Sequence, residues 1–219
     1  MRYIIMCGGR HIDQNNPKQL FRVKNETFVE RTIRLLKENG IKAEDIVISA
    51  SIPAFTKFGI TTVSTISPRQ DRWFDAAFPL LDLDPACYIF GDVYFSPVAI
   101  KKIIETETDD IEFFASAPPF AETYYKPYAE PFAFKVADKQ HFVKALERTS
   151  ELFDSGELKR GIAWEIWQVI KGTKLNEIDY TNYTVINDYT CDVDCTRELQ
   201  ELKDKLAAKK HLLKEGEIT

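Results

Sequence analysis

The fold of this chain is decided by one stretch near its start, Arg2-Tyr-Ile-Ile-Met-Cys-Gly-Gly-Arg-His-Ile-Asp-Gln-Asn-Asn-Pro-Lys-Gln-Leu20. Its apolar run, Tyr3–Cys7, predicts a buried strand that ends abruptly at Gly8-Gly9. Paired glycines after a strand present bare backbone N–H groups beyond the edge of a sheet, where proteins often hold phosphates. Arg10 and Lys18 then add positive charge around the glycines. The stretch therefore indicates a ligand with phosphate groups, such as a nucleotide or a phosphate ester.

A plainer interpretation of the glycine pair is a tight turn followed by a surface lysine. The loop from Gly8 to about Glu26 is long for a compact domain, and long loops without regular structure are often functional. This length favours the functional interpretation.

The composition excludes several classes of protein. With 219 residues, 44% of them hydrophobic, the chain can form one domain with a substantial core. The net charge of −5 argues against nucleic acid as a partner. No apolar run approaches the roughly 20 residues that cross a bilayer, and the N-terminal run is too short for a secretory signal. The cysteines lack the spacing of a zinc site, so we expect a reduced, cytoplasmic protein that binds no membrane: Cys7, Cys87, Cys191 and Cys195.

Strand and helix patterns alternate along the first half of the chain and continue less regularly in the second. The predicted strands are Tyr3–Cys7, Asp45–Ala50, Thr61–Ile66, Cys87–Phe90, Asp110–Ser116, Pro131–Val136 and Tyr183–Asn187. The predicted helices follow Thr27 and Ser96 as N-caps and cover Asp71–Leu83, Asp138–Phe153, Gly161–Lys171 and Thr196–Leu213. This alternation predicts an α/β fold, a single domain over residues 1–219 with three α/β/α layers and a mostly parallel mixed sheet, as in Rossmann-like proteins. An irregular subregion over about 118–174 is expected to lie over the sheet.

Acidic residues follow two of the predicted strands. Asp92 comes directly after the strand Cys87–Phe90, and a carboxylate there can bind Mg²⁺ or simply start the next helix. Asp192 and Asp194 point to the same side of an extended segment, where they repel each other unless a cation joins them. The alternative is that one of this pair caps the helix that Thr196 begins.

The aromatic segment from Phe120 to Phe134 could form the wall of a second ligand site, which would bind an acceptor molecule. Tyr125 can stack on a ligand, Lys126 can meet a phosphate, and Glu130 can bind hydroxyl groups. Aromatic residues at this density also often just cover a sheet. Trp164 and Trp167 fit a core or a dimer contact, which leaves a homodimer open.

In their order along the chain, these motifs resemble the nucleotidyltransferase family of sugar-nucleotide pyrophosphorylases and cytidylyltransferases, which has a GT-A-like fold. The matching segments are the strand into Gly8-Gly9 with Pro17-Lys18-Gln19-Leu20, Phe28–Leu36 with Gly40-Ile41, Gly91-Asp92-Val93 and Asp192–Leu199. The match covers most of the chain and is most specific at the N-terminus. The loop between Gly9 and Pro17 is shorter than the family's loop, and the family's second spaced glycine is absent.

The resemblance implies an Mg²⁺-dependent enzyme in which a phosphate-bearing acceptor, such as a sugar phosphate, attacks the α-phosphate of a nucleoside triphosphate and releases pyrophosphate. CTP is slightly favoured by analogy with small members of the family. The implied residues are catalytic Lys18 and Arg10; nucleotide-binding Gly8, Gly9, Arg69, Gln70 and Arg72; metal-binding Asp92, Asp194 and Asp192; and acceptor-binding Lys126, Tyr125 and Glu130, within the subregion 118–174.

Two other functions stay open. A glycosyltransferase of the same fold usually holds its metal through Asp-x-Asp after the central strand, whereas this chain has Gly91-Asp92-Val93-Tyr94 there. A nucleotide-binding or regulatory homologue without catalysis would fit the shortened glycine loop.

Overall fold

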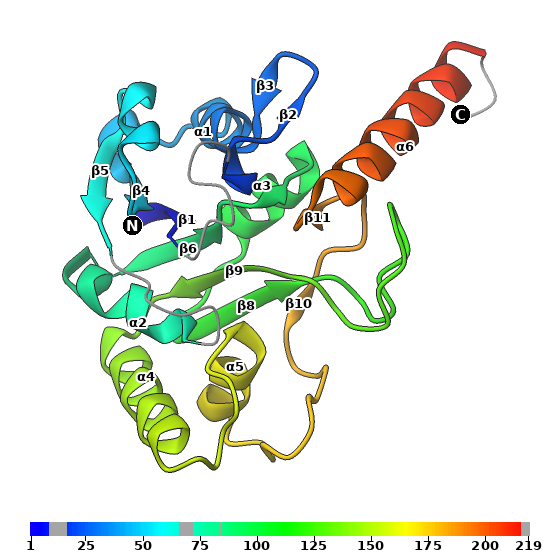
Figure 1. The fold of residues 1–219 in the computed structure, drawn as a ribbon. Coiled ribbons are helices and arrows are strands. Elements are labelled where there is room, and N and C mark those ends of the chain that lie inside the picture. Colours follow the sequence, from blue (N-terminus) through cyan, green and yellow to red (C-terminus); the bar gives the residue numbers. More distant parts are fainter. Residues whose placement is uncertain (9–16, 66–71, 84, 216–219) are drawn as a thin grey trace.

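The centre of the computed structural model is a seven-stranded sheet with the order β10-β8-β9-β6-β1-β4-β5 (Figure 1). The structure describes residues 1–8, 17–65, 72–83 and 85–215, with side chains up to residue 209. The strands are β1 (Arg2–Cys7), β4 (Ile46–Ala50), β5 (Thr61–Ser64), β6 (Ala86–Phe90), β8 (Ile111–Ala115), β9 (Pro131–Val136) and β10 (Thr184–Val185). Strand β9 runs antiparallel to β6 and β8, and the other neighbouring pairs are parallel. The predicted mostly parallel mixed sheet is confirmed.

Helices cover both faces of the sheet, which gives the three predicted layers. The α-helices are α1 (Phe28–Glu38), α2 (Trp73–Ala77), α3 (Pro97–Glu105), α4 (Lys139–Asp154), α5 (Ala163–Lys171) and α6 (Thr196–Glu215). Figure 1 shows α1 and α3 on one face and α2, α4 and α5 on the other, while α6 projects from the body. Short 3-10 helices are η1 (Lys18–Leu20), η2 (Ala43–Asp45), η3 (Pro53–Phe58) and η4 (Phe78–Leu83). Two small antiparallel ribbons pair β2 (Arg22–Val23) with β3 (Glu26–Thr27) and β7 (Val93–Tyr94) with β11 (Cys191–Asp192).

The starts of α1 and α3 are fixed by side-chain caps that the sequence predicts. Thr27 Oγ1 accepts a hydrogen bond from Glu30 N at 3.2 Å, and Glu30 Oε2 accepts one from Thr27 N at 2.7 Å. Ser96 Oγ accepts from Ala99 N at 2.9 Å, just before Pro97. Because each cap satisfies backbone donors that the helix leaves free, both helices begin where the sequence predicts.

An aromatic core holds α5 against the sheet. The Phe113 ring stacks on Phe134 at 4.4 Å between centroids and meets Trp164 edge-on at 4.8 Å. Trp164 Nε1 also donates to the carbonyl of Ala129 at 3.1 Å. Trp164 and Trp167 are 5% and 2% exposed, so of the two predicted roles the structure shows the core contact.

Several predicted elements differ in extent from the observed ones. The single helix expected over Asp71–Leu83 is instead the short α2 followed by η4, because Pro79 lacks the N–H that an α-helix would need there. Helix α6 begins at Thr196, as predicted, and extends to Glu215, beyond the predicted end at Leu213. The predicted irregular subregion contains β9, α4 and α5, and its longest stretch without a strand or helix belongs to the segment 116–130 between β8 and β9.

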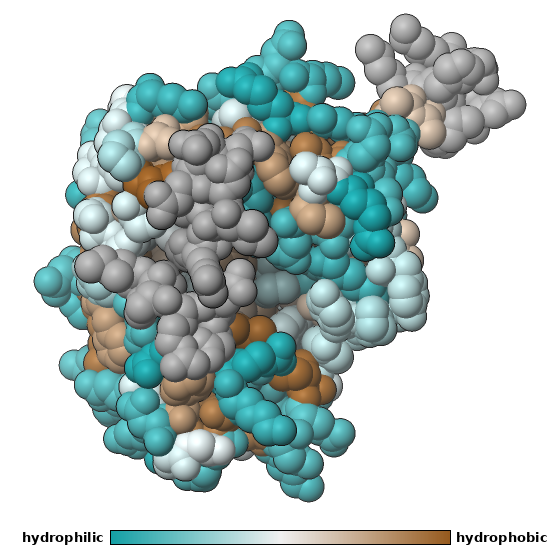
Figure 2. Space-filling view, in the orientation of Figure 1, coloured by the Kyte–Doolittle hydropathy of each residue, from teal (hydrophilic) through white to brown (hydrophobic). Residues whose placement is uncertain are grey.

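The surface drawn in Figure 2 is largely hydrophilic, with hydrophobic residues in scattered groups. Among the helices in the described part of the chain, none is long and apolar enough to cross a membrane. Cys7 and Cys87 are free, buried thiols, as their apolar surroundings in the sequence predict.

Candidate active site

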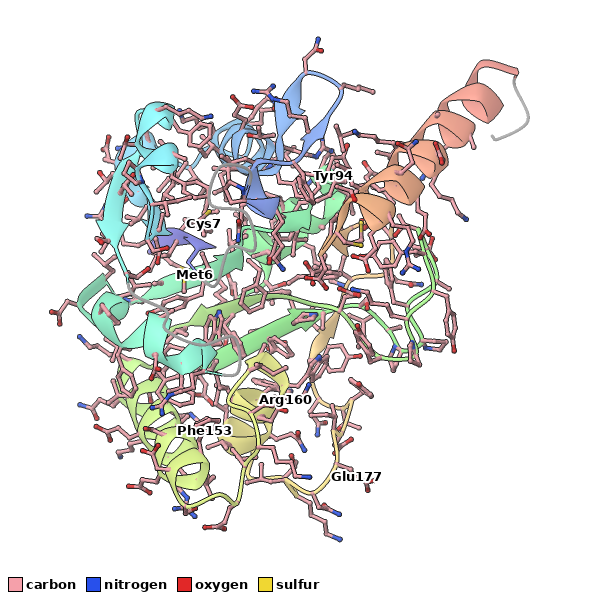
Figure 3. The ribbon with its side chains drawn as sticks, in the orientation of Figure 1. Met6, Cys7, Tyr94, Phe153, Arg160 and Glu177 are labelled. Atoms are coloured by element: carbon pink, nitrogen blue, oxygen red, sulfur yellow. The ribbon has the colours of Figure 1, made fainter. Side chains whose placement is uncertain are left out.

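The ends of β1 and β6 lie side by side and position the first carboxylate. The two strands pair in parallel, with Met6 opposite Phe90, and Gly91 N donates to the carbonyl of Met6 at 3.0 Å. Figure 3 labels Met6 and Cys7 at this end of β1. A Cβ on Gly91 would lie 2.7 Å from both Cys7 Sγ and the Met6 carbonyl oxygen, so only glycine allows this approach. Asp92 therefore follows β6 at the carboxyl edge of the sheet, where open α/β proteins bind ligands.

The ribbon of β7 and β11 carries the other two carboxylates to Asp92. Asp192 lies opposite Val93, and Val193 N donates to the carbonyl of Asp92 at 3.1 Å. The carboxylates of Asp92, Asp192 and Asp194 each have an oxygen within 4.8 Å of the others. The structure thus brings together the three residues that the sequence predicts as metal ligands.

Asp192 has the surroundings of a metal ligand rather than of an ordinary core residue. Its Oδ1 is buried and has no hydrogen-bond partner. Burial and the nearby carboxylates of Asp92 and Asp194 raise its pKa well above the usual range, against the lowering effect of Lys18. A buried oxygen with no partner, among like charges, suits a hard divalent cation such as Mg²⁺. The residues present therefore fit the metal that the sequence resemblance implies.

Lys18 lies between two of these carboxylates. Helix η1 places its Nζ 2.6 Å from Asp92 Oδ2 and 2.6 Å from Asp194 Oδ1. Burial alone would lower the pKa of the ammonium, but Asp92, Asp192 and Asp194 outweigh burial and raise it. Lys18 therefore stays protonated, and because 30% of its side chain is exposed, its ammonium can still reach a ligand.

A second lysine, Lys126, enters the site from the segment 116–130. Its Nζ lies 2.9 Å from Glu130 Oε1, 3.3 Å from Asp194 Oδ2 and 3.6 Å from Glu198 Oε1. Burial raises the pKa of Glu130 to about 7, although Lys126 acts in the opposite direction. Burial also opposes the charge of Asp194, but Lys18 and Lys126 prevail and lower its pKa.

Glu198 is a site residue that sequence reasoning missed. The sequence suggests only a favourable acidic residue in the first turn of α6, whereas the structure has its Oε2 accept a hydrogen bond from Asp194 N at 2.7 Å. Together with Lys126, this contact adds Glu198 to the carboxylate cluster. Its position four residues after Asp194, across the start of a helix, is the one signal in the sequence that could have pointed to it.

Of the remaining predicted site residues, three lie in the described ranges and four lie outside them. Gly8 is half-buried directly after β1. Tyr125 is 71% exposed. Arg72 binds carboxylates of α2 and α4, with Nε 2.9 Å from Asp75 and Nη1 3.4 Å from Asp154. The predicted residues outside the described ranges are Gly9, Arg10, Arg69 and Gln70.

Comparisons with known proteins place this fold among nucleotide-transferring enzymes. A scan against protein-family models and a search of curated proteins found no match. The solved CTP:phosphocholine cytidylyltransferase from Streptococcus pneumoniae is similar, with a TM-score of 0.59 and 17% identity over 94% of this chain and 98% of that chain. For 4-diphosphocytidyl-2C-methyl-D-erythritol synthase from Anaerococcus prevotii, the TM-score is 0.61 and the identity 13%, over 94% of this chain and 95% of that chain. For the inositol-1-phosphate CTP transferase from T. maritima, the TM-score is 0.55 and the identity 15%, over 93% of this chain and 95% of that chain. The chain thus shares the fold of these nucleotidyltransferases over nearly its whole length.

Proposed function

We propose that this protein is an Mg²⁺-dependent nucleotidyltransferase. The observation that carries the proposal is the meeting of Asp92, Asp192 and Asp194 with Lys18 at the carboxyl edge of the sheet. Reactions at phosphates are catalysed mainly by positioning and by positive charge near the phosphate oxygens. A divalent cation held by the carboxylate cluster would position the phosphates, and the cation and the protonated Lys18 would supply the positive charge.

In the proposed reaction, a phosphate oxygen of the acceptor attacks the α-phosphorus of a nucleoside triphosphate. A new bond forms between that oxygen and the α-phosphorus, and the bond from the α-phosphorus to the bridging oxygen breaks, so that pyrophosphate leaves. Lys18 exchanges its carboxylate partners for phosphate oxygens when the nucleotide binds, and it stabilises the charge that develops there. Asp92, Asp192 and Asp194 would hold Mg²⁺, which supplies further positive charge against the phosphates.

The two substrates are assigned to different segments. Gly8 and Gly9 with Arg10 are the proposed phosphate grip, and Arg69, Gln70 and Arg72 remain the proposed contacts to the base or ribose. For the acceptor, the exposed ring of Tyr125 on the segment 116–130 offers a stacking surface, with Glu130 as a hydroxyl contact. We favour CTP as the nucleotide, since the names of two of the similar solved structures include it.

The test is a screen for pyrophosphate release. The purified protein is incubated with CTP, UTP, GTP or ATP, Mg²⁺ and a panel of phosphorylated acceptors that includes sugar, polyol and amino-alcohol phosphates. We expect release from one nucleotide that depends on both acceptor and metal, and at least about a 100-fold loss for Asp92→Asn. Glu44→Gln is the control that should keep full activity, because the Glu44 carboxylate is exposed and only pairs with Lys42 at 3.9 Å.

The same screen, extended to nucleotide sugars and to thermal unfolding with each nucleotide, separates the two alternatives. A nucleotide-binding homologue without catalysis would show specific thermal stabilisation by one nucleotide without pyrophosphate release. A glycosyltransferase would release a nucleoside phosphate from a nucleotide sugar instead. Either result would replace the proposed function.

A further inference from the structure

Lys126 differs from Lys18 in how completely it is enclosed. Only 9% of its side chain is exposed, against 30% for Lys18. Its backbone is fixed by a pair of hydrogen bonds with Phe120, both 2.9 Å long. Its ammonium also faces the rings of Tyr124 and Tyr128, at 5.1 and 5.7 Å from their centroids. Lys18 can therefore leave the carboxylates for a ligand, whereas Lys126 is held in place.

The ammonium of Lys126 contributes charge to the site more than it fixes geometry. It lies within 4 Å of three carboxylates, those of Glu130, Asp194 and Glu198. Asp194 has a separate support, since its backbone N–H donates to Glu198 Oε2 at 2.7 Å. Loss of the ammonium would thus leave Asp194 anchored while it removes one positive charge next to the metal ligands.

We propose that Lys126 is a permanent counter-charge of the metal site, a positioning residue that acts through Asp194 and Glu198 and keeps the affinity for a free divalent cation low. The proposal rests on the proposed function, because it presupposes that the carboxylates bind a metal. A fixed positive charge a few ångströms away repels a divalent cation twice as strongly as a monovalent one. A cation that arrives with a triphosphate brings compensating negative charge, so Lys126 favours the metal–nucleotide complex over the metal alone.

The experiment measures the binding of Mn²⁺ alone to the nucleotide-free protein, by electron paramagnetic resonance of the free ion. The variants are Lys126→Gln, which removes the charge, and Lys126→Arg, which keeps it. We expect Lys126→Gln to bind Mn²⁺ about 10-fold more tightly than the wild type, while Lys126→Arg stays within about twofold.

Lys135 supplies the matched control. It is buried to the same degree, because 6% of the surface of the whole residue is exposed, against 7% for Lys126. Its Nζ donates to the backbone carbonyls of Ile103, Ile104 and Thr106 at 3.1, 2.8 and 2.6 Å, at the end of α3. Lys135→Gln should therefore lower the Tm without changing the Mn²⁺ affinity.

Unchanged or weaker Mn²⁺ binding by Lys126→Gln would overturn the proposal, and so would equal tightening in Lys126→Arg. If Lys126→Gln does not fold, the double variant Lys126→Gln/Glu130→Gln is compared with Glu130→Gln, because it also neutralises Glu130, the buried carboxylate nearest to the Lys126 ammonium. The same tightening is expected in that background, and its absence overturns the proposal. If neither the wild type nor Lys126→Gln binds Mn²⁺, the metal role of the site fails as well. Failure of the pyrophosphate screen alone removes the proposed reaction and leaves the role of Lys126 standing.

Discussion

The same group of carboxylates raises the pKa values of both Lys18 and Asp192. Lys18 is held charged by three carboxylates, which outweigh the burial of its ammonium. Asp192 is pushed towards its neutral form by burial and by Asp92 and Asp194. Both pKa shifts arise because several carboxylates lie close together. A bound divalent cation would compensate this negative charge, and it could then also bind phosphates. Individual substitutions in the site can test this charge balance.

Lys18→Ala should abolish turnover and leave the fold intact. We expect kcat to fall by about 100-fold or more, because the substitution removes a charge that stabilises the transition state. Stability should fall modestly, because Asp92, Asp192 and Asp194 lose a counter-charge, but no cavity forms in the core, since the side chain is partly exposed. Steady-state pyrophosphate release and thermal unfolding check the two parts, with Lys24→Ala, on an exposed turn, as control. Full turnover by Lys18→Ala would remove this lysine from the catalytic machinery.

Glu130 should make the stability of the protein depend on pH. Its pKa in the folded protein is about 7, above the ordinary value of 4.5, so the folded state binds the proton more tightly than the unfolded state. The stabilisation is present at low pH and is lost as the pH rises from about 4.5 to about 7. Glu130→Gln stays neutral, so its free energy of unfolding relative to the wild type should rise by about 2 kcal/mol between pH 5 and pH 8. Urea unfolding at the two pH values measures the difference, and a constant gap would contradict the assignment.

At the scale of elements, the junction of β1 and β6 positions the site. Strand β1 ends at Cys7, and the backbone of Gly91 hydrogen-bonds to Met6 beside it. Asp92 then begins the ribbon of β7 and β11, which returns Asp192 and Asp194 to the same place. Tyr94, labelled in Figure 3 near the start of α6, belongs with Phe28 and Leu202 to a second apolar cluster, which also includes Cys191 of β11. Three segments far apart in the sequence therefore meet through one strand junction.

Gly91→Ala should damage both stability and activity. The added Cβ would lie 2.7 Å from Cys7 Sγ and from the Met6 carbonyl oxygen, which is far inside van der Waals contact. We expect a loss of about 1–3 kcal/mol in the free energy of unfolding and a displaced Asp92. The displacement should lower kcat even in assays well below the Tm of the variant, where the protein is still folded and the loss of stability has no effect on activity. Gly172→Ala is an informative control, because nothing lies within 4 Å of its Cβ position and only backbone strain should matter there.

Thr27→Ala should weaken α1 without touching the site chemistry. The substitution removes the hydroxyl of the capping box and leaves the N–H of Glu30 without its partner. We expect a loss of about 1 kcal/mol in the free energy of unfolding. Thr27→Ser keeps the hydroxyl and should recover most of it, as measured by urea unfolding of both variants. Equal stability of the Ala and Ser variants would show that the cap contributes nothing.

For the whole molecule, the layers of the fold could be predicted from the sequence because they follow local signals. The helix caps, the apolar runs and the alternation of strand and helix patterns each act over a few residues, and they correctly predict the mixed sheet between helices. The grouping of three carboxylates could also be predicted, since Asp92 and the Asp192–Asp194 pair follow strand ends that the fold brings to one edge. The enclosure of Lys126 by Glu130 and Glu198 could not, because it depends on how residues 116–130 pack against α6, for which no local pattern exists.

The claim that this site transfers a nucleotidyl group is tested most directly by following the α-phosphate. The nucleotide–acceptor pair selected by the pyrophosphate screen is supplied with a label on the α-phosphorus, with Mg²⁺ present, for the wild type and Asp92→Asn. We predict that the label moves to the acceptor, with one pyrophosphate released for each label transferred, and that Asp92→Asn loses the transfer. Label that remains in the nucleoside triphosphate, or that appears only in free nucleoside phosphate, would contradict the account.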